Sequence, residues 1–167
     1  MKWNKDLIIV KDNFFNKTLF KKIYADLDKV KFVNRFTKIN ANKQRIYFDV
    51  LLGPEHPGCI ALQSFFKDEL GVNVKTLLSY YFLSTKHEEP TVHTDLYKIN
   101  CIIYLKGKSL INNGTGFYEK NEGADVLNSH IGFKENRAVF FHANRKHASL
   151  QFAEGATGRY IMTNFIK

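Results

Sequence analysis

The sequence predicts a mostly β protein with supporting helices: an antiparallel double-stranded β-helix, or jelly roll, with N-terminal helices packed on its outer sheet. Short apolar segments rich in β-branched residues recur after residue 77, and turns that contain glycine separate them. Two segments before residue 77 carry apolar residues at helical spacing instead. With 167 residues and 44% hydrophobic content, the chain fits a single domain at 1–167. We expect a helix-containing support region at 1–76 and the jelly-roll core at 77–167.

The support region begins with a predicted strand and a predicted helix. The apolar run in DLIIVKDNF, at 6–14, favours a strand. Asn16 can cap a helix over 17–30. An apolar stripe follows that helix, formed by Leu19, Ile23, Tyr24 and Leu27.

A second strand and a second helix complete the support region. RIYFDVLL, at 45–52, has the composition of a strand, and HPGCIALQSFFKDEL, at 56–70, predicts a helix. Gly71 follows as the residue that ends this helix, because glycine adopts the left-handed conformation of a helix C-terminus without strain. Both helices would bury their apolar stripes against the outer sheet of the roll.

The core region predicts a series of antiparallel strands. TLLSYYFLS begins the roll, and KHEEPT forms the loop after it. Later strands are expected in KINCIIYLKG (98–107), FYEK (117–120), NRAVFFHANRKHASLQF (136–152, two strands) and GRYIMTNFIK (158–167). NNGTG, at 112–116, predicts a turn, and AEGATG, at 153–158, predicts the turn of a hairpin between the last two strands.

The run TVHTD holds the most informative pair of residues, His93 and Asp95. Residues two apart on a strand point to the same face, so this imidazole and this carboxylate would share one space. A histidine from a distant strand would complete a two-histidine, one-carboxylate triad, which leaves coordination positions on iron(II) open. His147 is the favoured third ligand, and His142 is its rival. For the pair alone, a hydrogen bond at a strand end is the simpler alternative.

Several segments together carry a resemblance to a known family. They are HTD at 93–95, INCIIYL at 99–105, GTGFY at 114–118, NRAVFFHANRKHASL at 136–150 and GRYIMTNF at 158–165. In order and approximate spacing, residues 77–167 resemble the catalytic core of the iron(II)/2-oxoglutarate-dependent oxygenases. Within that superfamily the prolyl 4-hydroxylase-like branch is the most similar.

The resemblance implies a role for each of six residues. His93, Asp95 and His147 would bind Fe(II). Arg159 would bind the remote carboxylate of 2-oxoglutarate through its planar fork of donors, and Thr163 would touch the same carboxylate. Tyr104 would donate a hydrogen bond to this cosubstrate. Ascorbate would serve as an added reductant.

The spacing between the third histidine and the arginine differs from the family pattern. Twelve positions separate His147 from Arg159, somewhat more than in similar prolyl hydroxylases. If the AEGATG turn forms a hairpin, Arg159 lies across from Leu150 or Gln151, roughly 10–13 Å from His147 at ~3.3 Å per residue. An arginine side chain and a five-carbon diacid together span such a distance.

The expected activity is hydroxylation of a C–H bond, of a prolyl or other peptidyl substrate or of a small molecule, with release of succinate and carbon dioxide. A nucleic-acid demethylase of the same chemistry and a non-catalytic jelly-roll binding module are the alternatives. Substrate contacts are expected from KHEEP, from the segment at 107–114 and from NEGADVLNSH. These sequences do not identify the substrate.

The basic charge lies almost wholly in the amino-terminal part. Residues 1–46 hold twelve basic and four acidic residues, whereas 47–167 hold thirteen and twelve, and the whole chain carries +9. Such an excess can attract nucleic acid, although a solvated lysine-rich helix face is the favoured interpretation. No long apolar run or signal-peptide core is present, so we expect a cytoplasmic protein without a membrane partner.

The remaining cysteines and histidines do not suggest another site. Cys59 and Cys101 lack the spacing of a zinc site or a disulfide framework, and Cys101 is expected to pack as a small apolar residue. His56, His87 and His130 stand beside proline, glutamate or serine and are expected on surface loops. Neither a glycine-rich phosphate loop nor a nucleophile elbow is present.

Overall fold

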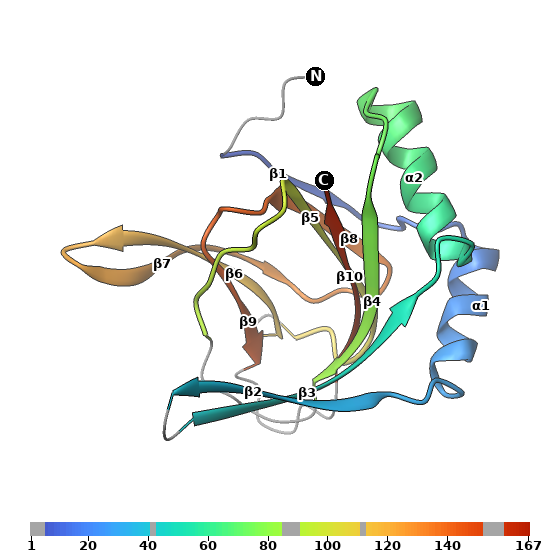
Figure 1. Cartoon of the computed structure of the whole chain (residues 1–167). Coiled ribbons are helices and arrows are strands. Elements are labelled where there is room, and N and C mark those ends of the chain that lie inside the picture. The colour runs from blue at the N-terminus through green and yellow to red at the C-terminus, as the bar shows by residue number, and fades with distance from the viewer. Residues whose placement is uncertain (1–5, 41–42, 85–90, 111–112, 152–158) are drawn as a thin grey trace.

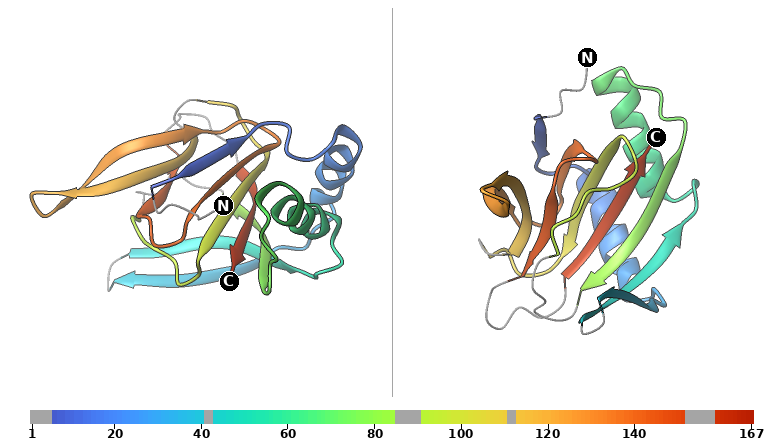
Figure 2. Two further views of the ribbon diagram at one scale, coloured as in Figure 1. Left: turned by 90° about the horizontal axis from the view of Figure 1, so that it is seen from above. Right: turned by 60° about the vertical axis from the view of Figure 1, so that its left-hand side comes forward.

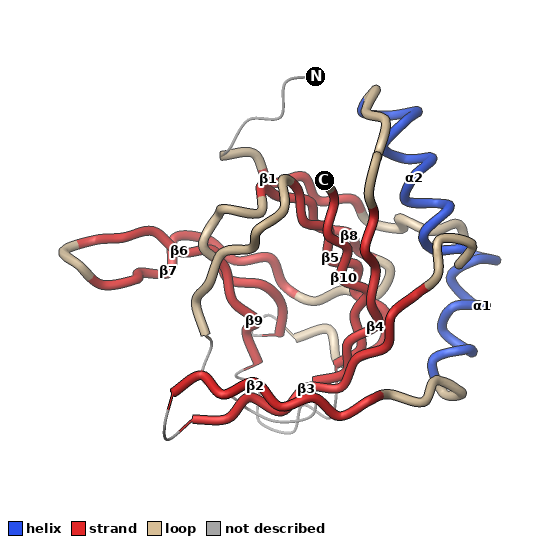
Figure 3. Tube along the Cα trace, in the orientation of Figure 1, coloured by secondary structure: helices blue, strands red, loops and turns tan. Residues whose placement is uncertain are grey.

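A computed structural model describes residues 6–40, 43–84, 91–110, 113–151 and 159–167 of the chain (Figure 1). These residues form two β-sheets and a pair of helices. In chain order the elements are β1 (Ile8–Lys11), α1 (Lys17–Leu27), β2 (Val33–Asn40), β3 (Lys43–Leu52), α2 (Pro57–Leu70), β4 (Leu77–Ser84), β5 (Ile99–Lys106), β6 (Asn113–Asn121), β7 (Ala124–Gly132), β8 (Arg137–His142), β9 (His147–Gln151) and β10 (Arg159–Ile166). The chain is therefore mostly β, as the sequence predicts (Figure 3).

All strand pairs in the two sheets are antiparallel. The larger sheet has the order β1-β8-β5-β10-β4-β3-β2, and the smaller sheet has the order β7-β6-β9. The β6–β7 hairpin projects away from the rest of the molecule (Figures 1 and 2). Strands from both sides of residue 76 share the larger sheet, and the expected division there remains a prediction.

The main apolar core joins both helices to one face of the larger sheet (Figure 1). On β10, Met162 and Ile166 belong to this core, whereas the alternate residues of the same strand line a cavity on the other side of the sheet. Phe65 of α2 stacks on Phe140 of β8 with ring centroids 4.8 Å apart. Cys101 is fully buried, as expected of a small apolar residue. The helices thus cover the face of the sheet that does not carry the candidate site.

The ends of both helices follow the sequence signals. The side chain of Asn16 accepts a hydrogen bond from the Leu19 amide at 2.9 Å, which caps α1. Gly71 adopts φ +64° directly after α2, the left-handed conformation that favours glycine. Helix α1 ends at Leu27, three residues before the predicted end at 30. Neither α1 nor α2 is long and apolar enough to cross a membrane.

The predicted turn at NNGTG is wrong, because β6 begins at Asn113 and includes both glycines. A Cβ on Gly114 would collide with the carbonyl oxygen of Ile131 on β7, so glycine here permits close approach of strands rather than a turn. The real turn follows at Glu122 and Gly123, with φ +50° and +85°. Two consecutive positive values match a two-residue hairpin, and the predicted substrate loop NEGADVLNSH lies in this hairpin instead.

The predicted hairpin between the last two strands is also wrong. Strand β9 pairs with β6 in the smaller sheet, whereas β10 pairs with β4 and β5 in the larger sheet. Residues 152–158, where the turn was expected, and the KHEEP loop with His87 lie outside the described residues. Strand β2, which pairs with β3 at the edge of the larger sheet, was not predicted from the sequence.

Asn136, which directly precedes β8, holds the segment between β1 and α1 through its side chain. Its side-chain amide donates to the Phe15 carbonyl at 2.8 Å and accepts from the Phe15 amide at 2.9 Å. We expect Asn136→Ala to lower the free energy of unfolding by about 3 kcal/mol, because two buried backbone groups would lose their partners. Urea denaturation measures this change.

The matched control for this variant is Asn13→Ala. Asn13 also has a positive φ, 53° against 61° for Asn136, but it is exposed. Its replacement should cost only the backbone strain, about 1 kcal/mol. Equal losses in the two variants would mean that the Asn136 side-chain hydrogen bonds contribute nothing.

Candidate functional site

His93 and His147 face each other across an antiparallel bridge. The His93 amide donates to the His147 carbonyl at 3.0 Å, and the His147 amide donates back at 2.9 Å. Directly opposed residues project to the same side, and the two imidazole centroids lie 4.4 Å apart. The Asp95 amide donates to the Ala143 carbonyl at 2.8 Å, which holds Asp95 against the segment between β8 and β9. One potential ligand atom from each of the three residues lies within 4.8 Å of the others.

Backbone carbonyls orient both imidazoles. Nδ1 of His93 lies 2.8 Å from the Thr91 carbonyl, and Nδ1 of His147 lies 2.8 Å from the Arg145 carbonyl. A carbonyl oxygen can only accept, so each Nδ1 carries the proton and each Nε2 has the lone pair that a metal ion needs. Hydrogen bonds from the second ring nitrogen to a carbonyl are typical of metal-binding histidines. These residues therefore have the donor types and the orientation of a two-histidine, one-carboxylate metal site.

Asp95 is held as a carboxylate. Burial raises its pKa, but the adjacent imidazoles of His147 and His93 and the amide of Asn100 together lower the pKa below its usual value. Nε2 of His147 lies 3.3 Å from Oδ2 of Asp95, and Nδ2 of Asn100 donates to the same oxygen. The carboxylate is thus ionised and positioned by a side chain from β5.

The rival ligand His142 does not join this group in the described structure. It ends β8, and its Nδ1 accepts from the Asn144 amide at 3.4 Å. The preceding residue, Phe141, packs against the His147 ring with centroids 4.7 Å apart. Because neighbouring strand residues point to opposite faces, His142 is turned away from the three-residue group.

Two of the remaining histidines differ from the expected surface-loop positions. His56 is the half-buried N-cap of α2: its Nδ1 accepts from the Gly58 amide at 3.1 Å, and its Nε2 lies 2.9 Å from the Tyr81 hydroxyl. Burial lowers the pKa of His56, which keeps the ring neutral. His130 is partly buried within β7 rather than in a loop.

A cavity of about 440 Å³ lies between the two sheets and contains the three-residue group. Its described lining is Phe82, Leu83, Ser84, Thr91, His93, Asp95, Asn100, Ile102, Thr115, His147, Ala148, Ser149, Arg159, Ile161, Thr163 and Phe165. Asp95 is the only acidic residue in this described lining, and Arg159 is the only cationic side chain besides the histidines. The cavity therefore combines side chains suited to a metal ion with a cationic side chain suited to an anion.

Arg159 connects the two sheets. This residue is 4% exposed, and its Nη1 donates to the Gly114 carbonyl of β6 at 2.5 Å, while its Nη2 donates to the Ser149 hydroxyl of β9. Ser149 lies two residues from His147 on one strand, roughly 7 Å at ~3.3 Å per residue. Thr163 lines the cavity from the same face of β10 as Arg159. The structure thus brings Arg159 close to the three-residue group although the expected hairpin is absent.

The role expected of Tyr104, a hydrogen bond to the cosubstrate, stays a prediction. Tyr104 is fully buried and is not among the described residues that line the cavity. Its hydroxyl lies 2.8 Å from Oγ1 of Thr115 and 3.2 Å from the Ile131 carbonyl, so Thr115 stands between Tyr104 and the cavity. Thr115 was not predicted to line the cavity, because its segment was predicted to form a turn. Ser149 could have been found, since it shares a strand face with His147 two residues away.

No family model matches the sequence, and no curated protein matches it. Solved structures do match. A 2OG-Fe(II) oxygenase family oxidoreductase from Burkholderia pseudomallei has a TM-score of 0.68 at 12% identity, with 96% of this chain and 84% of that chain covered. A prolyl hydroxylase from Trichoplax adhaerens, in complex with a hypoxia inducible factor peptide fragment, has a TM-score of 0.63 at 16% identity, with 95% of this chain and 82% of that chain covered.

HygX from Streptomyces hygroscopicus, solved with nickel, 2-oxoglutarate and hygromycin B, has a TM-score of 0.62 at 10% identity, again covering 95% of this chain and 82% of that chain. The chain has the fold of the 2OG-Fe(II) oxygenases. At these identities the likeness concerns the fold, and the expected prolyl hydroxylase-like branch is represented among the similar structures. The oxygenase fold also agrees with the predicted superfamily.

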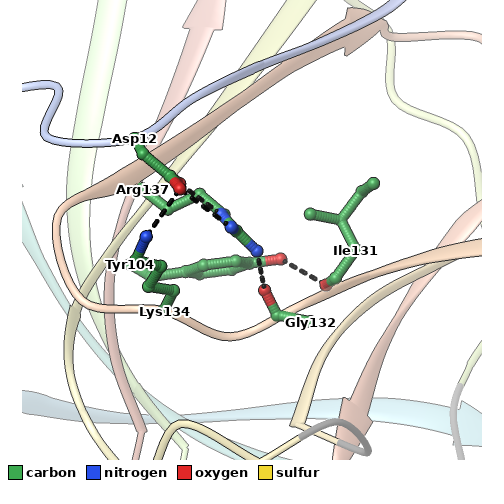
Figure 4. Close-up of polar contacts among 6 residues, drawn as sticks. All are labelled: Asp12, Tyr104, Ile131, Gly132, Lys134 and Arg137. Atoms are coloured by element: carbon green, nitrogen blue, oxygen red, sulfur yellow. Dashed lines mark hydrogen bonds and ion pairs between the residues drawn. The ribbon is translucent and has the colours of Figure 1, made fainter.

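On this oxygenase fold a network of polar contacts holds the segment behind Tyr104 (Figure 4). Asp12, beyond β1, accepts from Nε of Arg137 at 2.6 Å and pairs with Lys134 at 2.7 Å. Nη1 of Arg137 donates to the Gly132 carbonyl at 3.0 Å, beside the Ile131 carbonyl that Tyr104 contacts. The network therefore links the segment that follows β1 to the end of β7.

Asp12→Asn should remove part of the acid sensitivity of the fold. Hydrogen bonds from Arg137 and Lys134 lower the pKa of Asp12 far below its ordinary value of 3.8. The carboxylate therefore stabilises the folded state above pH 3.8, and this contribution is lost as the pH falls from there towards the folded-state pKa. The free energy of unfolding, measured in urea, should differ less between wild type and variant at about pH 3 than at about pH 6. An equal or larger difference at the lower pH would contradict this assignment.

Proposed function

We propose that this protein is an iron(II)- and 2-oxoglutarate-dependent oxygenase that hydroxylates a C–H bond, and that its two sheets have the topology of a double-stranded β-helix. The observation that carries the proposal is the arrangement within one cavity. His93, Asp95 and His147 hold ligand atoms within 4.8 Å of one another, and the buried guanidinium of Arg159 lines the same space. The fold shared with known oxygenases supports the same conclusion.

The metal-binding residues fit iron(II) by their chemistry. Two neutral imidazoles and one carboxylate bind three positions of the ion and leave the others open. The carbonyls of Thr91 and Arg145 fix the imidazole orientation, and Asn100 fixes the carboxylate. When bound, iron and 2-oxoglutarate would supply dioxygen activation and the electrons for it, with succinate and carbon dioxide as the coproducts.

Arg159 and Thr163 would hold the remote carboxylate of 2-oxoglutarate. A planar guanidinium matches a carboxylate with two parallel hydrogen bonds, and it stays charged when buried. Ser149, which contacts Arg159, lies roughly 7 Å along β9 from the proposed ligand His147, a length that a five-carbon diacid can span. The apolar walls at Ile102 and Ile161 would exclude water from the space between.

The substrate that we favour is a prolyl or other peptidyl group. Leu96 is 102% exposed directly after Asp95, which suits an apolar substrate group beside the metal. The Trichoplax structure holds a peptide fragment, but HygX holds hygromycin B, so a small molecule remains the alternative within the same chemistry. Phe82 and Phe165 line the cavity and would contact either kind of substrate.

The two other functions stay predictions. Lys17, Lys21 and Lys22 of the basic segment are exposed on α1, and this helix packs on the sheet face opposite the cavity. A strand of nucleic acid bound there would be remote from the proposed metal ligands. A demethylase should still show nucleic-acid affinity that falls steeply with salt, whereas a binding module should bind neither metal nor 2-oxoglutarate.

The deciding experiment measures turnover and binding together. Purified protein with iron(II), ascorbate and 2-oxoglutarate should release succinate, and it should release more when a suitable peptide is added. In calorimetry the protein loaded with Mn(II), which does not support turnover, should bind 2-oxoglutarate. Absence of both succinate release and binding would reject the proposed oxygenase function and favour the binding module.

A further inference from the structure

We propose that Asn100 is a positioning residue for the metal ion. Its amide holds the Asp95 carboxylate where the ion needs it, although the same amide lowers the stability of the fold. Asn100 acts through Asp95 and is not one of the groups that would touch the ion. This inference rests on the proposed function and deepens it, since it assigns part of the metal affinity to a residue other than the three proposed ligands.

Asn100 is the second residue of β5, and it is only 1% exposed. It lies directly opposite Phe165 of β10 on one side and Phe141 of β8 on the other. Opposed side chains of antiparallel strands stand on the same face of a sheet. Phe165 lines the cavity, and Phe141 packs against the ring of His147. Asn100 is therefore a polar side chain between two aromatic ones, on the sheet face that carries the candidate site.

The two ends of the Asn100 amide have different surroundings. Nδ2 donates to Oδ2 of Asp95, the oxygen that lies 3.3 Å from Nε2 of His147. Oδ1 is buried and has no hydrogen-bond partner within the part of the chain that the structure describes. A buried acceptor without a donor lowers the stability of the folded state. One end of the amide thus serves the proposed ligand, and the other end weakens the fold.

Local packing gives no reason for an asparagine at this position. Reversing the amide would turn Oδ1 towards the Asp95 carboxylate, so that two acceptors would face each other and the carboxylate would lose a donor. Leucine has the same branched shape as asparagine and would bury no polar atom beside Phe141 and Phe165. An apolar side chain of similar shape is neutral or stabilising at such a site. The contact with Asp95 is therefore what asparagine adds.

This contact matters most before the ion arrives. Because the Arg145 carbonyl holds the proton on Nδ1 of His147, Nε2 of His147 carries a lone pair. Oδ2 of Asp95 also carries lone pairs, so these two atoms repel each other unless a cation lies between them. The Asp95 side chain is 22% exposed and could turn towards water. The hydrogen bond from Asn100 opposes this rotation, so an arriving ion finds both atoms in place.

The first experiment measures Mn(II) affinity by calorimetry and the thermal midpoint of the metal-free protein. Asn100→Leu should weaken Mn(II) binding about 10-fold, the effect of losing a group that orients a ligand. Its thermal midpoint should equal or exceed that of wild type, because the buried acceptor is removed. Asn100→Ala removes the amide without adding bulk and should weaken Mn(II) binding to a similar extent. A purely structural role would instead lower the thermal midpoint.

The matched control is Asn164→Leu, the same substitution on the neighbouring strand β10. Asn164 is also fully buried, but both ends of its amide have partners: it accepts from the Ser79 hydroxyl and donates to the carbonyls of Cys101 and Met162. It alternates with Thr163, which lines the cavity, so it points to the other face of the sheet. Asn164→Leu should lower the thermal midpoint by about 5 °C or more and leave Mn(II) affinity unchanged.

The second experiment tests by a double-mutant cycle whether Asn100 acts through Asp95. Asn100→Leu should weaken Mn(II) binding about 10-fold in the wild-type background and not at all in the Asp95→Ala background, because the amide then has no carboxylate to hold. The remaining affinity of Asp95→Ala is measured at high Mn(II) concentration. If Asn100 contacted the ion itself, its replacement would weaken binding equally in both backgrounds, and the positioning role would be wrong.

The outcomes separate this inference from the proposed function. If wild type binds neither Mn(II) nor 2-oxoglutarate, the proposed function fails and the role of Asn100 fails with it. If wild type binds both, and Asn100→Leu and Asn100→Ala bind Mn(II) as tightly as wild type, only this inference is wrong and the oxygenase proposal stands. An Asn100→Leu protein that does not fold, or whose midpoint falls as far as that of Asn164→Leu, would also overturn it, since asparagine would then be needed for the fold.

Discussion

His147→Ala should abolish succinate release and weaken Mn(II) binding by at least ~100-fold. Loss of a group that only hydrogen-bonds to a ligand weakens metal binding about 10- to 100-fold, and loss of the ligand itself should weaken it more. The imidazole of His147 lies 4.4 Å from that of His93 and 3.3 Å from the Asp95 carboxylate, so no described side chain can replace it without a shift of β9. Calorimetry with Mn(II) and a succinate assay with iron(II) together measure the two effects.

The matched control is His142→Ala, five residues earlier in the same region of the chain. Because His142 points away from the three-residue group, this variant should keep its metal affinity and most of its turnover. The reverse result, with His142 essential and His147 dispensable, would reassign the third ligand and would contradict the geometry described above. His93→Ala and Asp95→Ala should behave like His147→Ala.

Arg159→Gln should weaken 2-oxoglutarate binding on the order of 100-fold, because a bidentate, charge-assisted contact to the carboxylate is lost. Mn(II) affinity should not change, since Arg159 is not one of the three residues that would hold the metal ion. Calorimetry of the Mn(II)-loaded protein measures both values. Arg159→Lys should recover only part of the affinity, because an ammonium group cannot present the same planar fork.

A stability measurement must accompany this variant, because Arg159 also donates to Gly114 and Ser149 across the two sheets. If the thermal midpoint of Arg159→Gln stays close to that of wild type, its binding loss reports on the ligand alone. The probe 2-oxobutyrate, which lacks the second carboxylate, supplies the internal control. Equal weakening of both acids would mean that Arg159 shapes the cavity and does not bind the remote carboxylate.

Sequence patterns predicted the local structure well where a residue type has one dominant structural use. Asn16 and Gly71 mark helix ends by their hydrogen bonding and their φ preference, and both are found there. The glycine of NNGTG failed as a turn signal because glycine also serves where strands approach closely, as Gly114 does against Ile131. Composition alone cannot separate these two uses.

Only the parts of the site that lie within one strand could be predicted from the sequence. The same-face rule for residues two apart relates His93 to Asp95, and it also relates His147 to Ser149. The bridge that joins these two pairs depends on how distant strands pair, and the expected hairpin between β9 and β10 was wrong. For the same reason the contact between Tyr104 and Thr115 could not be predicted, since it depends on the packing of β6 against β5.

The reciprocal backbone hydrogen bonds between His93 and His147 have a consequence for the protein before any ion arrives. A main-chain ladder, rather than the ion, sets the separation of the two rings, so metal capture should require little rearrangement. The amide protons of these two residues should accordingly exchange slowly with deuterated solvent in the metal-free protein, and adding Mn(II) should slow them only slightly further. A site of this kind is assembled by folding itself, and its affinity would be limited by ion dehydration more than by chain ordering.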